Sequence, residues 1–173
     1  MEELLFLARA DAGGLARDVG PVCLLEALEE AAEAVSRPGY PRSGCWPCIR
    51  LESIDAALAV AGSGSELTRL FTNLLENAVR HTPPEGTVTV SATVDAMSVT
   101  VTVTDTGEGI APEHLPHLGE RFYRVDAART GGTGGTGLGL AICRSITEAH
   151  GGRMTIESKV GEGTRVRIRL LLV

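Results

Sequence analysis

The stretch that decides the fold reads ELTRLFTNLLENAVRH at residues 66–81, followed by two prolines and then by GTVTVSATV at residues 86–94. In the first part, apolar residues recur at steps of three and four, which predicts an amphipathic helix that ends at the prolines. In the second part the period changes to two, and it stays two over residues 99–103. A turn at 95–97 therefore predicts an antiparallel hairpin directly after the helix.

The flanking segments add further helices and strands. Upstream, the patterns predict helices over 1–10 and 22–36, a loop over 37–48, short strands near 49–52 and 57–60, and a break at 62–65. Downstream, they predict a turn at 105–110, little periodic structure over 112–136, a helix over 138–150, and strands at 153–158 and 164–172. Helices and hairpins in this order favour an α+β fold over a doubly wound parallel sheet.

Composition narrows the classes of function. The chain has 173 residues, 43% of them hydrophobic, which suits one ordinary domain with a sizeable core. A net charge of -6 and few aromatic residues argue against a nucleic-acid partner. No apolar run approaches the roughly 20 residues of a membrane span, and no signal peptide is evident, so intracellular residence is expected. Cys45 and Cys48 have the spacing of a redox or half-metal motif, but two incidental loop thiols are the favoured interpretation.

The predicted helix over 66–81 carries a polar edge beside its apolar stripe. Asn73, Asn77 and Arg80 lie within about 60° of one another around the helix axis. Asparagine is a poor residue for a helix interior, so two of them one turn apart indicate the edge of a cleft. Amide oxygens suit magnesium and a guanidinium suits phosphate. Solvent-facing amides are the alternative interpretation.

Asp105 ends a predicted strand, and Gly107 and Gly109 follow it closely. An ionised carboxylate only accepts hydrogen bonds, so it could bind the exocyclic amine of adenine and would repel the corresponding oxygen of guanine. The glycines would let the backbone approach a flat ring. An ordinary Asp-Gly turn is the alternative.

Residues 131–139 contain six glycines and lead into the predicted helix over 138–150. Such a segment offers backbone N–H groups and the positive end of a helix dipole to phosphate. It is neither a P-loop nor a dinucleotide fingerprint, because no Gly-Lys-Ser/Thr follows and no parallel βαβ pattern surrounds it. A plain linker is the alternative, although linkers rarely lead straight into an apolar helix.

Taken together and in this order, these features resemble the catalytic ATP-binding domain of bacterial two-component sensor histidine kinases. That domain belongs to a wider ATPase family with type II topoisomerases, Hsp90 chaperones and mismatch-repair ATPases. The resemblance rests on LFTNLLENAVRHT (70–82), DTGEGI (105–110), ERFYR (120–124), GTGLGLAI (135–142) and GEGT (161–164). The long loop over 37–48 departs from the family, as does the lack of an acidic residue at 62–65, but neither departure touches these boxes.

The resemblance implies a two-layer α/β sandwich of the Bergerat type, with a mixed, mainly antiparallel sheet packed against helices and ATP between the layers. It implies that Asn77 binds magnesium with Asn73 nearby, that Arg80 contacts phosphate, and that His81 flanks the nucleotide. His81 is alternatively a simple helix-end residue. His114, His117 and His150 are expected to be ordinary solvated residues.

The resemblance also assigns the remaining candidate residues. Asp105 would bind the adenine amine, with Thr164 supporting it through water. The base pocket would be shaped by Gly107, Gly109 and Ile110. Phe122 and Arg124 would pack near a lid that closes over the phosphates and comprises Gly135, Thr136, Gly137, Leu138, Gly139 and Leu140.

The same resemblance implies domains and partners. Residues 1–18 would be the end of a dimerisation helix with its linker, and 19–173 the catalytic domain. A histidine kinase phosphorylates a histidine that precedes an acidic residue, and no histidine here has that neighbour, so the acceptor is expected upstream of this chain. A response regulator would receive the phosphoryl group, and the full-length protein would be a membrane-anchored homodimer with this domain in the cytoplasm. Two alternatives stay open: a serine kinase of the anti-sigma-factor type and a non-catalytic nucleotide-binding module.

Overall fold

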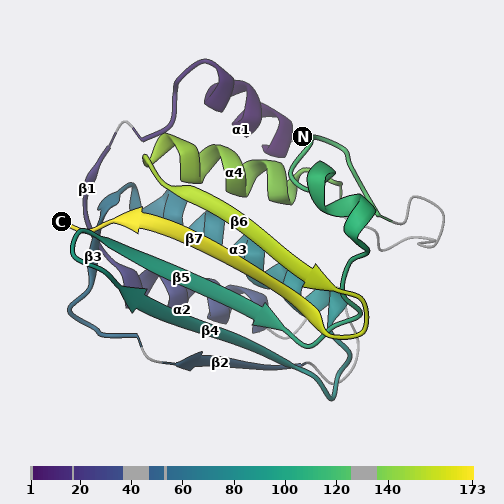
Figure 1. The fold of residues 1–173 in the computed structure, drawn as a ribbon. Helices are drawn as coiled ribbons and strands as arrows, with labels where there is room; N and C mark the ends of the chain where they lie inside the picture. Colours follow the sequence, from purple (N-terminus) through teal and green to yellow (C-terminus); the bar gives the residue numbers. More distant parts are fainter. Residues whose placement is uncertain (1, 17, 37–46, 53, 126–135) are drawn as a thin grey trace.

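The structure is a computed structural model that describes residues 2–16, 18–36, 47–52, 54–125 and 136–173. It has two layers, a five-stranded sheet and a layer of helices against one face of that sheet (Figure 1). The strands lie in the order β2 (Cys48–Glu52), β4 (Thr87–Val94), β5 (Ser98–Asp105), β7 (Gly163–Leu171) and β6 (Arg153–Lys159). Only β2 and β4 are parallel neighbours in this sheet, so the expected mixed, mainly antiparallel α+β sandwich is confirmed.

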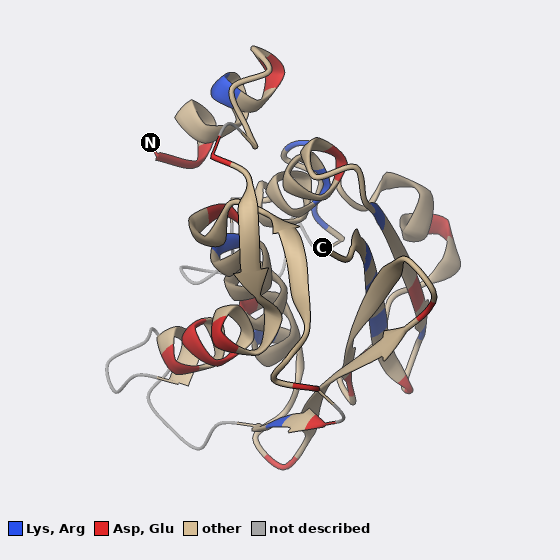
Figure 2. Cartoon of the chain, turned by 90° about the vertical axis from the view of Figure 1, so that its left-hand side faces the viewer, with Lys and Arg blue, Asp and Glu red and all other residues tan. Residues whose placement is uncertain are grey.

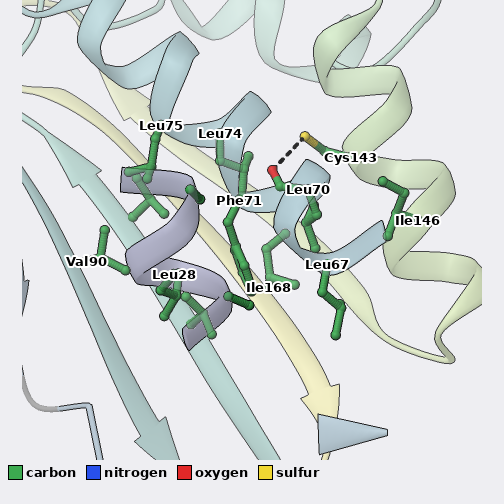
Figure 3. Packing of buried hydrophobic residues seen from close by; sticks show 14 of the residues in the cluster. Leu28, Leu67, Leu70, Phe71, Leu74, Leu75, Val90, Cys143, Ile146 and Ile168 are labelled. Carbon is green, nitrogen blue, oxygen red and sulfur yellow. Dashed lines mark hydrogen bonds between the residues drawn. The ribbon is translucent and has the colours of Figure 1, made fainter. Parts of the chain in front are cut away.

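The helical layer is built around the helix that the sequence predicts most clearly. Its members are α1 (Glu2–Asp11), α2 (Leu24–Ser36), α3 (Gly64–His81) and α4 (Gly139–Ala149). All seven apolar residues of the α3 stripe are buried, and Figure 3 shows several of them packed among side chains from the sheet and the other helices. Each buried leucine, valine or phenylalanine of the stripe stabilises the fold by roughly 1.5–3 kcal/mol relative to an exposed position. The buried thiol of Cys143 on α4 donates to the Leu70 carbonyl of α3, and burial raises the pKa of that thiol.

The hairpin of β4 and β5 forms in the predicted place, with Val94 opposite Val99. Valines and an alanine of β4 and β5 point alternately into the core, whereas threonines occupy most of the positions between them. Because successive side chains of a strand point to opposite faces of the sheet, these threonines make its outer face polar. Charges are also segregated: acidic residues follow the exposed face of α2, and arginines alternate along β7 (Figure 2).

Two short strands were predicted wrongly or not at all. A strand at Gly20–Cys23 (β1) pairs antiparallel with Ala59–Gly62 (β3) in a separate two-stranded sheet, so α2 begins at Leu24 rather than at 22, and β3 lies two residues beyond the strand predicted at 57–60. Four-residue strands show too little periodicity to be recognised. Their pairing depends on a contact between residues some forty positions apart.

His150 is buried, so its expected solvation is wrong. Its Nε2 accepts a hydrogen bond from the Ser63 backbone N–H at 3.0 Å, while its Nδ1 donates to the Ile146 carbonyl at 2.8 Å. The ring thus ties the end of α4 to the turn before α3. This turn also differs from the predicted break, because α3 begins at Gly64 and the Ser63 side chain does not cap it.

The segment with little periodic pattern contains a short 3-10 helix at Pro112–His117 (η1). His114 on this helix is half-buried and lies 2.8 Å from the Tyr123 hydroxyl, so it is not the freely solvated residue that was expected. His117 is exposed, as predicted, and pairs with Glu120. Within the described residues, no helix has the length and apolar content needed to cross a membrane.

The N-terminal helix α1 packs against α4 and shares the core, because Phe6 and Leu7 are both buried. Arg69 of α3 lies 4.2 Å above the Phe6 ring. At one edge of the five-stranded sheet, β2 begins at Cys48, which is exposed. Cys45 and most of the predicted loop at 37–48 lie outside the described residues.

Candidate functional site

The two asparagines of the chain meet the first residue of α4. A Cβ placed on Gly139 would lie 3.6 Å from Asn73 Oδ1 and 3.6 Å from Asn77 Nδ2. The N–H groups in the first turn of a helix have no intrahelical partner and attract anions. Asn73 presents its amide oxygen to this helix end and Asn77 its amide nitrogen. An amide oxygen here can serve a hard cation that accompanies the anion. The predicted polar edge of α3 therefore faces the predicted phosphate-binding helix end.

The neighbouring surface of α3 is acidic rather than neutral. A cavity of about 440 Å³ opens between α1 and α3, and Asn73, Glu76, Glu2 and Glu3 are among its lining residues. Burial raises the pKa of Glu76, with the nearby Glu3 acting in the same direction and Arg80 opposing both. Asn73 thus separates an acidic cavity from the start of α4.

Asp105 ends β5 in a buried position, with only 7% of its surface exposed. Its Oδ1 accepts hydrogen bonds from the backbone N–H groups of Gly107 at 2.9 Å and Thr164 at 3.1 Å. Burial raises the pKa of this carboxyl, and the two hydrogen bonds oppose that effect. Thr164 therefore holds Asp105 directly through its backbone N–H. The family resemblance had implied support through water.

The loop after Asp105 is wedged between α3 and the turn that joins β6 to β7. A Cβ at Gly107 would lie 2.2 Å from the His81 carbonyl oxygen at the end of α3. Gly109 has a φ of +70°, and a Cβ there would lie 2.0 Å from the Lys159 carbonyl oxygen. Only glycine permits both approaches without a shift of the backbone.

Replacing Gly109 by alanine is expected to lower the free energy of unfolding by about 1–3 kcal/mol more than replacing Gly161. Both glycines have a left-handed backbone, but the Cβ position at Gly161 is open, whereas that at Gly109 is blocked by a carbonyl. Urea denaturation of the two variants measures the difference. Equal losses would show that the 105–110 loop is not held tightly against the β6–β7 turn.

Two residues that the sequence analysis did not single out hold this loop. Glu108 Oε1 lies 2.9 Å from His81 Nδ1, and both side chains are exposed. Ser158 on β6 accepts a hydrogen bond from the Ile110 backbone N–H at 2.8 Å. Nothing in the sequence marks Ser158, because it lies 48 positions from its partner along the chain.

The base of the predicted lid is fixed by a backbone contact. The Phe122 N–H donates to the Gly137 carbonyl at 3.0 Å, and both residues have a left-handed backbone. The Thr136 hydroxyl donates to Glu3 of α1 at 2.6 Å. Leu138 is buried and Leu140 half-buried, and both pack in the core, so any ligand contact there falls to their backbone.

Phe122 and Arg124 are both exposed, Phe122 by 61%. Gly135 lies outside the described residues. In the part of the chain that the structure describes, no three His, Cys, Asp or Glu side chains gather in a way that could hold a metal ion. A cation at this site would therefore be held by amide oxygens and by the anion that it accompanies.

The separate features converge along the last turns of α3. Asn73 and Asn77 face Gly139, and one turn later the His81 backbone touches the loop of Asp105. The loop is in turn closed by Thr164 and Ser158. A carboxylate, two amides and a helix N-terminus are thus connected through direct contacts around one end of a single helix.

Comparison with known proteins shows the family to which the chain belongs. Residues 62–173 match the family model described as histidine kinase-, DNA gyrase B-, and HSP90-like ATPase. The phosphate regulon sensor protein PhoR of Pseudomonas aeruginosa is 41% identical over 169 residues, which cover 95% of this chain and 36% of that protein. The chain thus spans about a third of the length of this curated relative.

Solved structures give the same result. The mycobacterial sensor histidine kinase MprB aligns with a TM-score of 0.72 and 30% identity over 88% of this chain and 98% of the other. Full-length ShkA, solved in complex with AMPPNP, aligns with a TM-score of 0.79 and 26% identity over 99% of this chain and 35% of the other. The chain therefore belongs to the family of histidine kinase-, DNA gyrase B- and HSP90-like ATPases, as a catalytic ATP-binding domain of the sensor histidine kinase type.

Proposed function

We propose that this chain binds magnesium-ATP and presents the γ-phosphoryl group to a histidine on an adjoining dimerisation domain outside residues 1–173, for relay to a response-regulator aspartate. The observation that carries the proposal is that Asn73 and Asn77 of α3 lie beside Gly139 at the start of α4, while His81 at the end of α3 touches the Asp105 loop. The family membership supports ATP as the ligand, and ShkA was solved with AMPPNP.

In this proposal, Asp105 accepts a hydrogen bond from the adenine amine, and its buried position strengthens that bond. The 105–110 loop, with Gly107, Gly109 and Ile110, forms the wall of the base pocket, and His81 flanks it. Because the loop is packed against α3, the base and the phosphates are held at a set distance from each other. This positioning is the main contribution that phosphoryl transfer requires from a protein.

The phosphates would lie at the N-terminus of α4, where the backbone N–H groups from Thr136 to Leu140 attract negative charge. Arg80 would contact phosphate, and Phe122 and Arg124 would pack beside the lid, to which Gly135 belongs. Magnesium, when bound, would neutralise phosphate charge. The Asn77 amide oxygen is its protein ligand in this proposal, with Asn73 beside it, since hard oxygen donors suit this ion.

We assign residues 1–18 to the end of the dimerisation helix with its linker, and residues 19–173 to the catalytic domain. The full-length protein would be a membrane-anchored homodimer with this domain in the cytoplasm, and its partners would be its own dimerisation domain and a response regulator. The relatives named as sensor proteins support a sensor kinase with a response regulator as its partner. They do not favour a serine kinase of the anti-sigma-factor type.

Transfer to an added histidine tests the proposal. With ATP labelled at the γ-phosphate, the chain alone is expected to stay unlabelled, whereas a dimerisation fragment that carries the acceptor histidine becomes labelled. The bond should be acid-labile, and a fragment with glutamine at the acceptor position is the control. ATP binding without transfer would favour the non-catalytic module, and acid-stable label on serine would favour the serine kinase.

A further inference from the structure

Ser158 lies near the end of β6, behind the Asp105 loop, and its hydroxyl has three close polar neighbours. The Ile110 N–H lies 2.8 Å from Oγ, the Gly163 carbonyl oxygen 2.9 Å, and the Thr164 hydroxyl oxygen 2.9 Å. The side chain is half-buried. It therefore joins the loop of the base pocket to both residues that follow the β6–β7 turn.

The direction of these three hydrogen bonds follows from the atoms involved. A serine hydroxyl has one proton and two acceptor positions. The Ile110 N–H can only donate, and the Gly163 carbonyl can only accept, so the Ser158 proton goes to Gly163. The Thr164 hydroxyl is the one neighbour that can do either, and it must therefore donate to Ser158. Its oxygen then keeps only lone pairs for other partners.

Thr164 is also hydrogen-bonded to Asp105 through its backbone, which brings the two residues together. Its backbone N–H bonds to Asp105 Oδ1 at 3.1 Å, and within one residue the hydroxyl oxygen lies close to the backbone nitrogen. A base in the pocket would thus meet two acceptors side by side, the Asp105 carboxylate and the Thr164 oxygen. A 6-amino group donates to such an edge, whereas a 6-oxo group is repelled by it.

We propose that Ser158 is a positioning residue that orients the Thr164 hydroxyl as an acceptor and so sets the preference of the pocket for a 6-amino purine. This inference rests on the proposed function, because it takes the Asp105 pocket as the site of the base. Without the Ser158 hydroxyl, Thr164 can rotate its proton toward the ligand, and Ile110 loses its partner.

Calorimetric titration with magnesium and ATP, ITP or inorganic tripolyphosphate tests the inference. Replacing Ser158 by alanine is expected to weaken ATP binding about tenfold while ITP binding is unchanged or tighter, so the ATP-to-ITP preference falls by about tenfold or more. Tripolyphosphate binding should not change, because it does not use the base pocket. Ser158→Thr keeps a hydroxyl and should keep the preference.

Thr155→Ala is the matched control, because it removes an exposed hydroxyl from the same strand. Should Ser158→Ala fail to fold, Thr164→Val tests the same point, since it keeps the backbone N–H and removes the acceptor. The inference is overturned if the preference stays unchanged in the folded variant, or if all three ligands weaken equally. A parent chain that does not prefer ATP to ITP would instead contradict the proposed function, and this inference with it.

Discussion

Replacing Asp105 by asparagine is expected to weaken ATP binding by about tenfold or more, equivalent to roughly 1–3 kcal/mol. The two backbone N–H groups on Oδ1 would hold the amide oxygen of the variant in that place. The amide NH₂ would then face the adenine amine, so that donor meets donor in a buried position. Isothermal titration calorimetry with ATP measures the loss.

Asp95→Asn provides the matched control, because Asp95 is an exposed carboxylate in the turn between β4 and β5. This variant should bind ATP as tightly as the parent. If Asp105→Asn also binds with the parent's affinity, Asp105 does not contact the base.

The pH dependence of binding gives a second measure of the same contact. Burial raises the pKa of Asp105, so this carboxyl takes up a proton at a higher pH than an exposed aspartate does. The ionised form accepts the amine hydrogen bond, and therefore ATP affinity should fall as the pH drops from about 7 toward the raised pKa. Asp105→Asn should lack this component, which the difference between the two pH profiles isolates.

Replacing Asn77 by alanine is expected to abolish the magnesium-dependent part of ATP binding. Asn77 lies beside Gly139 and is the amide that we assign as the ligand of the ion. Affinity in magnesium should fall by at least about tenfold, since even changes behind the ligands of a metal site often cost that much. Titrations in magnesium and in excess EDTA should then give the same affinity.

Asn77→Asp is the informative companion variant, because it retains an oxygen ligand for a hard cation. It should keep a difference between magnesium and EDTA that Asn77→Ala lacks. Asn73→Ala should cause a smaller loss, since Asn73 assists rather than holds the ion. Persistent magnesium dependence in Asn77→Ala would show that the ion is bound elsewhere.

Much of the helical layer was predictable because amphipathic periodicity is local. The spacing of Leu67, Leu70 and the apolar residues that follow them predicted the buried stripe of α3, and all seven are buried. The same alternation rule predicted the β4–β5 hairpin, whose turn joins adjacent strands. These elements needed no knowledge of the rest of the chain.

The sequence singled out residues of the candidate site but not all the contacts that these residues make. Asn73 and Asn77 were singled out because asparagine is a poor residue for a helix interior, and Asp105 because two glycines closely follow it at a strand end. Ser158 and His150 were missed because neither is unusual where it stands in the sequence. Their roles arise from partners such as Ile110 and Ser63, which lie 48 and 87 positions away along the chain.

Local patterns in the chain were thus sufficient for most of the helices and strands, the α+β class and the three groups of residues that resemble an ATP-binding site. The packing of distant segments determined the pairing of β1 with β3 and the burial of His150. It also determined the hydrogen bonds of Thr164 and Ser158 to the Asp105 loop. The physical reason is that side-chain periodicity is set by neighbours within a few positions. A hydrogen bond between remote residues exists only once the layers have come together.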